Sequence, residues 1–267
     1  MSHLLNRDRL DELFALCHHR AFVHPDPLEF LYDYPDLRDR EIVALIASSL
    51  AYGRVVQILK STSCILQRLG ASPYSFLLNS TRKTLLSLFS GFKHRFTTGE
   101  ELALVLWGLK NVIENYGSLH DCFISALDDE DDTILPALTR FVRQFRKHIP
   151  VTRDSLLPHP ERGSACKRLN LFLRWMVRQD NVDPGGWSRV PSAKLIVPLD
   201  THMYKISRLL HLTERKQADM KTAIEITNAF RKIIPEDPIR YDFVLTRLGI
   251  RGEMEPTALL KACGTEW

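Results

Sequence analysis

The leading candidate for a catalytic residue in this chain is an aspartate at the start of a helix. Asp200 follows the run LIVPL, and it precedes an amphipathic helix that we expect over Thr201–Leu210. In this N-cap position its carboxylate would lie against free backbone N–H groups and stay ionised. Asp200 is therefore either a cap alone, worth about 1 kcal/mol to its helix, or a cap that also supplies a fixed negative charge to a reaction.

A lysine near the start of an earlier helix is the second candidate. The segment RGSACKRLNLFLRWMVR predicts a helix with Ser164 as its N-cap, which places Lys167 and Arg168 in the first turn or just beyond it. The positive end of the helix dipole disfavours cations there, and a lysine must lose its proton before it can attack carbon. Lys167 and Arg174 share a polar face of this helix. Lys167 is thus either a nucleophile or a solvated or phosphate-binding side chain.

Positive charge is concentrated in one part of the chain. The net charge is +4, but the segment from Arg143 to Arg178 holds nine basic residues against Asp154 and Glu161. Nine minus two gives this segment +7, which leaves −3 for the rest. A local positive region suits an acidic polymer such as DNA, whereas a solvated helix face is the alternative.

The string PLDTH at 198–202 resembles the segment that carries the catalytic aspartate in the helix-hairpin-helix DNA glycosylases, which are related to endonuclease III. The resemblance continues through Tyr204, Lys205, Ile206 and Arg208. It implies an endonuclease III-like fold and a catalytic role for Asp200. In bifunctional members a lysine in or just after the hairpin precedes this aspartate. Here Lys167 precedes Asp200 by 200 − 167 = 33 residues, a separation similar to that in the archaeal 8-oxoguanine glycosylase branch.

The same resemblance implies a set of DNA-binding residues. A late-helix aspartate reads the oxidised guanine in the archaeal branch, and Asp242 lies at a similar place, with a solvent-facing helical acid as the alternative. The turn from Ser48 to Arg54 stands where these enzymes carry a base- or DNA-contacting residue. The usual hairpin glycines are absent, but free N–H groups at a helix start can still hold a phosphate. The expected binding residues are Tyr52, Arg54, Gly163, Ser164, Arg168, Arg174, Asp242 and Trp187, the last in a Gly-Gly-Trp loop expected at the surface that meets DNA.

Apolar spacing and capping residues predict an all-α fold with two helical lobes and a cleft between them. We expect a central lobe at 37–178, which includes the divergent hairpin and the basic helix, and a second lobe formed by 1–36 and 179–267. Loops at 150–163 and 179–194 bracket the basic helix. Helices are expected over 37–52, 54–69, 98–116, 133–148, 164–178, 201–210, 220–233 and 238–248.

Cysteine and histidine spacing argues against a metal centre. The five cysteines are Cys17, Cys64, Cys122, Cys166 and Cys263. Their spacing fits neither zinc nor iron–sulfur sites, so we expect reduced thiols, and the iron–sulfur loop of some endonuclease III relatives is absent. His18 and His19 are expected to form a partly exposed pair. We predict no metal and no cofactor.

The N-terminal segment lacks the uninterrupted apolar core of a signal peptide, and no run of eighteen apolar residues occurs. We therefore expect a cytoplasmic, nucleoid-associated protein with no membrane partner, acting as a monomer.

The preferred hypothesis is a DNA glycosylase with AP-lyase activity that acts on double-stranded DNA containing a damaged base, with 8-oxoguanine as the expected lesion. Lys167 would attack the sugar and Asp200 would assist. Two alternatives stay open: a monofunctional glycosylase in which Lys167 grips phosphate and Asp200 activates water, and a non-enzymatic nucleic-acid- or protein-binding helical module. The chain also resembles a bacterial helical family through its LLPHP, GSACKRLNLFLRWMVR and PLDTH strings, which name no reaction.

Overall fold

Helices make up nearly all of the regular structure, as the computed structural model shows for residues 6–147, 149 and 155–251. This confirms the predicted all-α class. The only strands in the described part of the chain form a short antiparallel hairpin, in which Lys93 pairs with Thr98 and His94 with Thr97. No helix among these residues is both long and apolar enough to cross a membrane.

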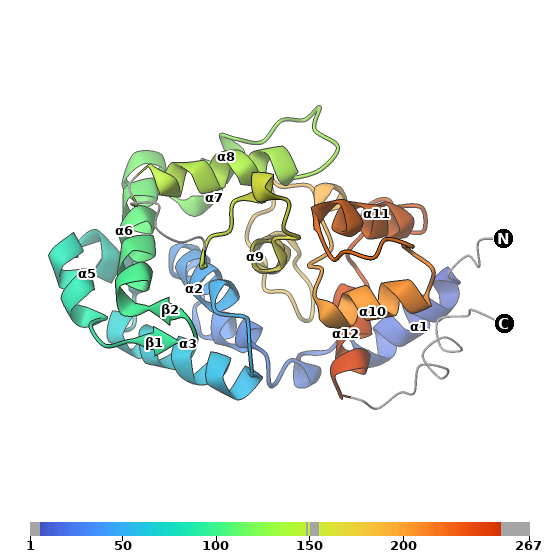
Figure 1. The fold of residues 1–267 in the computed structure, drawn as a ribbon, viewed down its shortest axis with the longest axis horizontal. Helices are drawn as coiled ribbons and strands as arrows, with labels where there is room; N and C mark the ends of the chain where they lie inside the picture. The colour runs from blue at the N-terminus through green and yellow to red at the C-terminus, as the bar shows by residue number, and fades with distance from the viewer. Residues whose placement is uncertain (1–5, 148, 150–154, 252–267) are drawn as a thin grey trace.

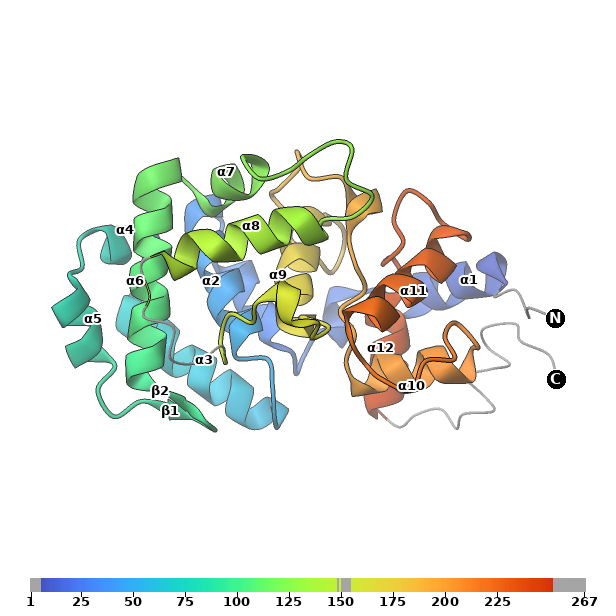
Figure 2. The same ribbon diagram turned by 45° about the horizontal axis from the view of Figure 1, so that its top comes forward.

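The helices gather in two groups with one helix between them (Figure 1). The first group contains α2 (Leu37–Ser49), α3 (Val55–Leu69), α4 (Pro73–Leu78), α5 (Arg82–Leu88), α6 (Gly99–Tyr116), α7 (Leu119–Ile124) and α8 (Leu135–Arg146), with β1 (Lys93–His94) and β2 (Thr97–Thr98). The second contains α1 (Arg7–Cys17), α10 (Thr201–Leu209), α11 (Met220–Arg231) and α12 (Asp242–Arg251). The helix between them, α9 (Lys167–Val177), lies against α2 and stays central in both views (Figure 2).

Four short 3-10 helices complete the described structure: η1 (Arg20–Phe22), η2 (Pro27–Asp33), η3 (Pro160–Arg162) and η4 (Ser192–Lys194). Their packing crosses the expected lobe boundary, because η2 packs against α2 and α3 whereas α1 packs against α12. The proposed limits of the lobes at 36 and 178 stay a prediction.

Local capping explains where most helices start. Thr98 and Glu101 form a capping box at the start of α6, and Gly117 ends that helix with a φ of 89°. Asp219 caps α11 through the N–H of Thr222. The predicted start of the last helix at Pro238 is wrong: residues 238–241 form turns, and α12 begins at Asp242.

The core between α9 and its neighbours is aromatic. Phe141 and Phe172 stack on one another, and the ring of Trp187 meets Phe172 edge-on at 5.1 Å. These rings are fully buried, and aromatic packing of this kind contributes about 0.5–1.5 kcal/mol per pair beyond burial of area. The centre of α9 is therefore held firmly, which fixes the residues at its N-terminal end.

Candidate active site

Lys167 is the first helical residue of α9. The prediction that Ser164 caps this helix is wrong: the N-cap is Cys166, whose backbone is left-handed with φ 46° and which makes no side-chain cap. Ser164 instead forms an isolated backbone bridge with Asp219, because the N–H of Met220 donates to the carbonyl of Gly163. Lys167 still stands at the positive end of the helix dipole, two positions closer to the helix start than expected.

The Lys167 side chain reaches both helix groups. Its Nζ donates to the carbonyl oxygen of Ala51, just after α2, at 3.3 Å, and lies 3.8 Å from Oδ2 of Asp200. The side chains of Lys167 and Asp200 are 31% and 21% exposed, so both are reachable from solvent. The sequence thus correctly predicted two residues that meet, although 33 positions separate them.

The two carboxylate oxygens of Asp200 have different partners. Oδ1 accepts hydrogen bonds from the backbone N–H groups of His202 at 2.9 Å and Met203 at 2.8 Å, which makes Asp200 the N-cap of α10. Oδ2 is the oxygen that faces Lys167. Capping therefore leaves one oxygen free to interact with the lysine or with a bound molecule.

Lys167 and Asp200 line one pocket. The space between its walls is about 480 Å³, which includes solvent at its open mouth. One face of α9 forms a wall, because residues spaced as i, i+4, i+7 and i+8 share a helix face. The lining residues are Asp26, Leu28, Lys167, Leu171, Arg174, Trp175, Pro198, Asp200, Asp242, Phe243, Thr246 and Arg247.

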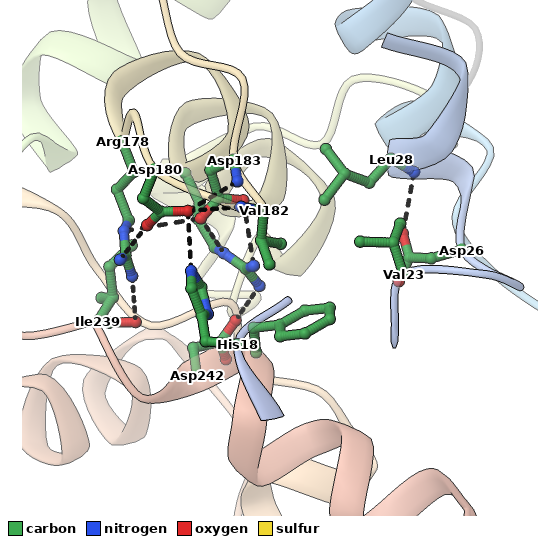
Figure 3. A network of polar contacts seen from close by, with 12 residues as sticks. His18, Val23, Asp26, Leu28, Arg178, Asp180, Val182, Asp183, Ile239 and Asp242 are labelled. Atoms are coloured by element: carbon green, nitrogen blue, oxygen red, sulfur yellow. Dashed lines mark hydrogen bonds and ion pairs between the residues drawn. The ribbon is translucent and has the colours of Figure 1, made fainter. Parts of the chain in front are cut away.

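A buried ion-pair network joins two of these lining residues, Arg174 and Asp242, to Asp183. Figure 3 shows Asp183 and Asp242 within this network. Arg174 donates through Nε and Nη2 to the two oxygens of Asp183, both at 3.1 Å, and through Nη1 to Oδ2 of Asp242 at 2.7 Å. All three side chains are at most 3% exposed. Arg174 is thus not available to a phosphate at the surface, but it fixes Asp242 in the pocket wall.

Asp242 keeps one oxygen unused. Its Oδ1 is buried and has no hydrogen-bond partner among the described residues. Burial raises the pKa of Asp242 to about 6, although the Arg174 charge opposes this rise. The alternative of a solvent-facing helical acid is therefore wrong: Asp242 presents a free acceptor, or a hydroxyl donor once protonated, beside a pocket.

The network continues from α9 to α1. Arg178 donates to Oδ2 of Asp180 at 2.6 Å, and Nε2 of His18 lies 2.8 Å from Oδ1 of the same carboxylate (Figure 3). Burial would raise the pKa of Asp180, but the hydrogen bond from His18 and the Arg178 charge hold it below its usual value. The expected partly exposed histidine pair is wrong, since His18 is buried and stacked on Phe14, whereas His19 is exposed.

Two further predicted binding residues, Arg168 and Tyr52, contact each other at the α2–α3 turn. The Arg168 guanidinium donates to the carbonyls of Ser49, at 2.6 Å, and Ser155, and it lies 4.8 Å from the ring centre of Tyr52. Arg54 is exposed and precedes α3. Gly163 is exposed, but its N–H is already bonded to the carbonyl of Pro160. The structure therefore leaves Tyr52 and Arg54 at the surface, and it uses Arg168 and the Gly163 backbone internally.

Trp187 is not a surface residue, and its predicted position at a DNA-facing surface is wrong. Its ring is fully buried, and Nε1 donates to Oε1 of Glu41 at 2.7 Å. The N–H groups of Gly185 and Trp187 bond back to the carbonyls at the end of α9, those of Trp175 and Met176. These hydrogen bonds direct the Gly-Gly-Trp loop inward, so that Trp187 lies in the core.

Part of the charge excess between 143 and 178 is neutralised within the molecule. Arg143 pairs with Glu161, Arg174 with Asp183 and Asp242, and Arg178 with Asp180 and Asp237. Arg153 and Asp154, which entered the sequence count, lie outside the described residues. Arg174 and Arg178 are buried in ion pairs with carboxylates from outside the segment, so these two charges do not contribute to a basic surface.

A family model matches residues 26–251, and its description is protein of unknown function (DUF2400). The chain belongs to this family. No curated protein and no solved structure matches it. The matched range contains every pocket residue from Asp26 to Arg247.

Sequence reasoning missed one ion pair of this DUF2400 pocket. Nη2 of Arg247 donates to Oδ2 of Asp26 at 2.6 Å and to the carbonyl of Val23 at 2.9 Å. Asp26 also caps η2 through the N–H of Leu28. The partners are 221 positions apart, and neither has a motif of its own, so no local signal could have paired them.

The cysteines that the structure describes are free thiols: Cys17, Cys64, Cys122 and Cys166. Cys263 lies outside the described residues. Burial raises the pKa of the Cys122 thiol to about 12 and that of Cys166 in the same direction. These two thiols are therefore poor nucleophiles, and neither lines the pocket of Lys167 and Asp200.

Proposed function

We propose that this chain is a DNA glycosylase with AP-lyase activity that removes a damaged base, with 8-oxoguanine as the preferred lesion. One observation carries the proposal: Lys167 Nζ and Asp200 Oδ2 lie 3.8 Å apart in the wall of the same open pocket. A primary amine beside a carboxylate is the pair that attack on a sugar carbon requires.

The proposed reaction begins with extrusion of the damaged nucleotide from the duplex, at a cost of a few kcal/mol. The neutral amine of Lys167 attacks C1′ of the deoxyribose. The bond between C1′ and the base breaks, and the base leaves with the bonding electron pair and takes up a proton. Asp200 Oδ2 accepts the proton that the amine loses and stabilises positive charge on the sugar.

The covalent sugar then gives the lyase step. Opening of the ring converts the Lys167 adduct into a Schiff base. This imine withdraws electrons, so a proton is lost from C2′ and the 3′ phosphate departs, which cleaves the strand. Water hydrolyses the Schiff base and releases the lysine.

The inner pocket suits a base with N–H donors. Asp242 Oδ1 is an unpartnered buried acceptor, and Arg174 holds it in place from the opposite oxygen. A purine oxidised at C8 carries a hydrogen on N7, which guanine lacks, so an acceptor here would favour the damaged base. A site that hydrogen-bonds one such group discriminates strongly against a ligand that lacks it.

Borohydride trapping tests the proposal. The protein is incubated with labelled duplexes that contain 8-oxoguanine, uracil, hypoxanthine or an abasic site, and borohydride is added to reduce any Schiff base. We expect a covalent adduct with the wild type and with Lys232→Gln, an exposed lysine outside the pocket, and no adduct with Lys167→Gln.

Each other outcome has a defined meaning. If no adduct forms and no base is released from any duplex, the enzyme proposal is wrong, and binding without lesion preference supports a non-enzymatic module. Base release that persists in Lys167→Gln without trapping supports a monofunctional glycosylase in which Asp200 activates water.

A further inference from the structure

An exposed aromatic pair lies next to the candidate nucleophile. The ring of Phe96, between β1 and β2, is 55% exposed and stacks on Tyr52 with ring centres 5.0 Å apart and an interplanar angle of 25°. Tyr52 directly follows Ala51, whose carbonyl accepts the hydrogen bond from Lys167. The pair Tyr52–Phe96, here called the aromatic platform, therefore begins one residue away from the site of the proposed covalent step.

The platform stands on a rigid base. The hydroxyl of Tyr52 donates to the carbonyl of His94 at 3.0 Å and lies 2.7 Å from Oγ1 of Thr97. His94 and Thr97 pair across the hairpin, and both are fully buried. Nδ1 of His94 lies 2.9 Å from the hydroxyl of Ser61 on α3. The tip of the hairpin thus projects from a buried, hydrogen-bonded foundation.

The backbone at this tip, next to Phe96, is in the left-handed region. Arg95 has a φ of 54°, which residues other than glycine seldom adopt. The Arg95 side chain crosses Gly53, whose φ is 96° and where a Cβ would lie 2.7 Å from Arg95 Nη1. Strain of this kind persists where surrounding structure imposes it, and it often occurs at functional sites.

Positive charge surrounds the platform. Arg54, Lys93 and Arg95 are exposed on the same turn and hairpin, and the Arg168 guanidinium lies 4.8 Å from the Tyr52 ring centre. Aromatic rings among cations match the chemistry of single-stranded nucleic acid, in which bases stack on rings and phosphates pair with lysine and arginine.

We propose that Phe96 stacks on an unpaired base of the DNA strand, next to the nucleotide that enters the pocket. This inference rests on the proposed function, which supplies DNA as the binding partner. It adds to that function a surface that holds the DNA strand after a base is extruded. Extrusion leaves a neighbouring base without one stacking partner, and Tyr52 and Phe96 already form a two-ring stack that a base extends. The platform replaces the lost stacking at the step where the duplex is least stable.

Fluorescence anisotropy tests the platform. The probe is a labelled duplex with a tetrahydrofuran abasic-site analogue, which the lyase step cannot cleave. We expect Phe96→Ala to weaken binding about 5- to 150-fold, since stacking on one aromatic ring is worth roughly 1–3 kcal/mol per base. Phe96→Trp should restore binding. The matched control is Leu16→Ala, which removes a 66% exposed side chain from α1, on the other side of the molecule from the hairpin (Figure 1).

Salt dependence separates stacking from charge. Phe96→Ala removes no cation, so the slope of log affinity against log salt should stay that of the wild type. Arg54→Gln removes one phosphate contact and should reduce the slope by about one. If Phe96→Ala reduced the slope of log affinity against log salt as Arg54→Gln does, the result would contradict a stacking role for Phe96.

The platform and the proposed enzyme activity can fail separately. If Phe96→Ala binds as tightly as Leu16→Ala while the wild type still forms a trapped adduct, the platform is wrong and the enzyme proposal stands. If binding depends on Phe96 but no adduct forms, the platform stands and the enzyme proposal is wrong. A wild type that does not bind the duplex overturns the platform too.

Discussion

Substitutions of Asp200 can separate helix capping from catalysis, because its two oxygens have separate partners. In Asp200→Asn the remaining carbonyl oxygen can still accept from the N–H groups of His202 and Met203, and asparagine is as good an N-cap as aspartate. The amide then places an N–H donor, instead of a negative oxygen, opposite Lys167. Asp200→Ala removes both the cap and the charge.

The expected losses of stability are small, and they differ between Asp200→Asn and Asp200→Ala. The Lys167–Asp200 pair is partly exposed and 3.8 Å long, so its loss should cost at most about 1 kcal/mol. Loss of the cap costs roughly 0.5–2 kcal/mol. For a chain of this size, about 1 kcal/mol lowers Tm by roughly 2–4 °C. Asp200→Asn should therefore melt close to the wild type, and Asp200→Ala measurably lower.

The expected changes in activity are large and similar. Loss of a positioned acid or base typically reduces the rate about 10²- to 10⁴-fold, so both variants should release base and form the trapped adduct far more slowly than the wild type. The assays are single-turnover base release and thermal melting of the same preparations. An Asp200→Asn protein with wild-type turnover would refute the reasoning and leave Asp200 as a cap alone.

Three further predictions follow from buried groups. Asp183→Asn leaves the buried Arg174 charge with one carboxylate partner fewer, so urea unfolding should show a loss of about 3–5 kcal/mol. Burial raises the pKa of Glu41 to about 7 from 4.5, so the folded state holds a proton that the unfolded chain releases, and stability falls as pH rises between these values. The measurement is urea unfolding at pH 5 and at pH 8. Between these two pH values the free energy of unfolding should decrease by about 2 kcal/mol less in Glu41→Gln than in the wild type. Trp187→Phe removes the hydrogen bond to Glu41 and should cost about 1–3 kcal/mol, while anisotropy finds unchanged DNA affinity.

Features encoded over a few neighbouring residues could be predicted from the sequence. The cap at Asp200, the capping box at Thr98 and Glu101, and the shared face of Lys167 and Arg174 all depend on spacing within one or two helical turns. Their physical causes are orphan backbone N–H groups and the helical period, which act locally. Each member of the candidate pair could therefore be singled out locally, whereas their pairing came from the resemblance to the helix-hairpin-helix glycosylases.

Features that depend on partners from distant segments could not be predicted. A count of charges between 143 and 178 suggested a basic surface, but it could not show that Asp237 and Asp242 neutralise Arg178 and Arg174. The Gly-Gly-Trp loop has the composition of a surface turn, and only its backbone bonds to the end of α9 bring Trp187 inside. The local sequence predicts the backbone conformation of such a segment, but it does not show which of its side chains face the core.

The geometry of the pocket follows from the meeting of helix N-termini. Lys167 is the first residue of α9, Asp200 is the N-cap of α10, and Asp242 is the first residue of α12. Each terminus directs positive partial charge and N–H groups toward its own first turn. The starts of three helices therefore bring Lys167, Asp200 and Asp242 to one pocket. In the proposed reaction a departing base would carry negative charge in the same region, where the helix dipoles and the buried Arg174 would stabilise it. Because Arg174 lies on the same helix as Lys167 and holds Asp242 at the start of α12, a shift of α9 would move Lys167 and Asp242 together.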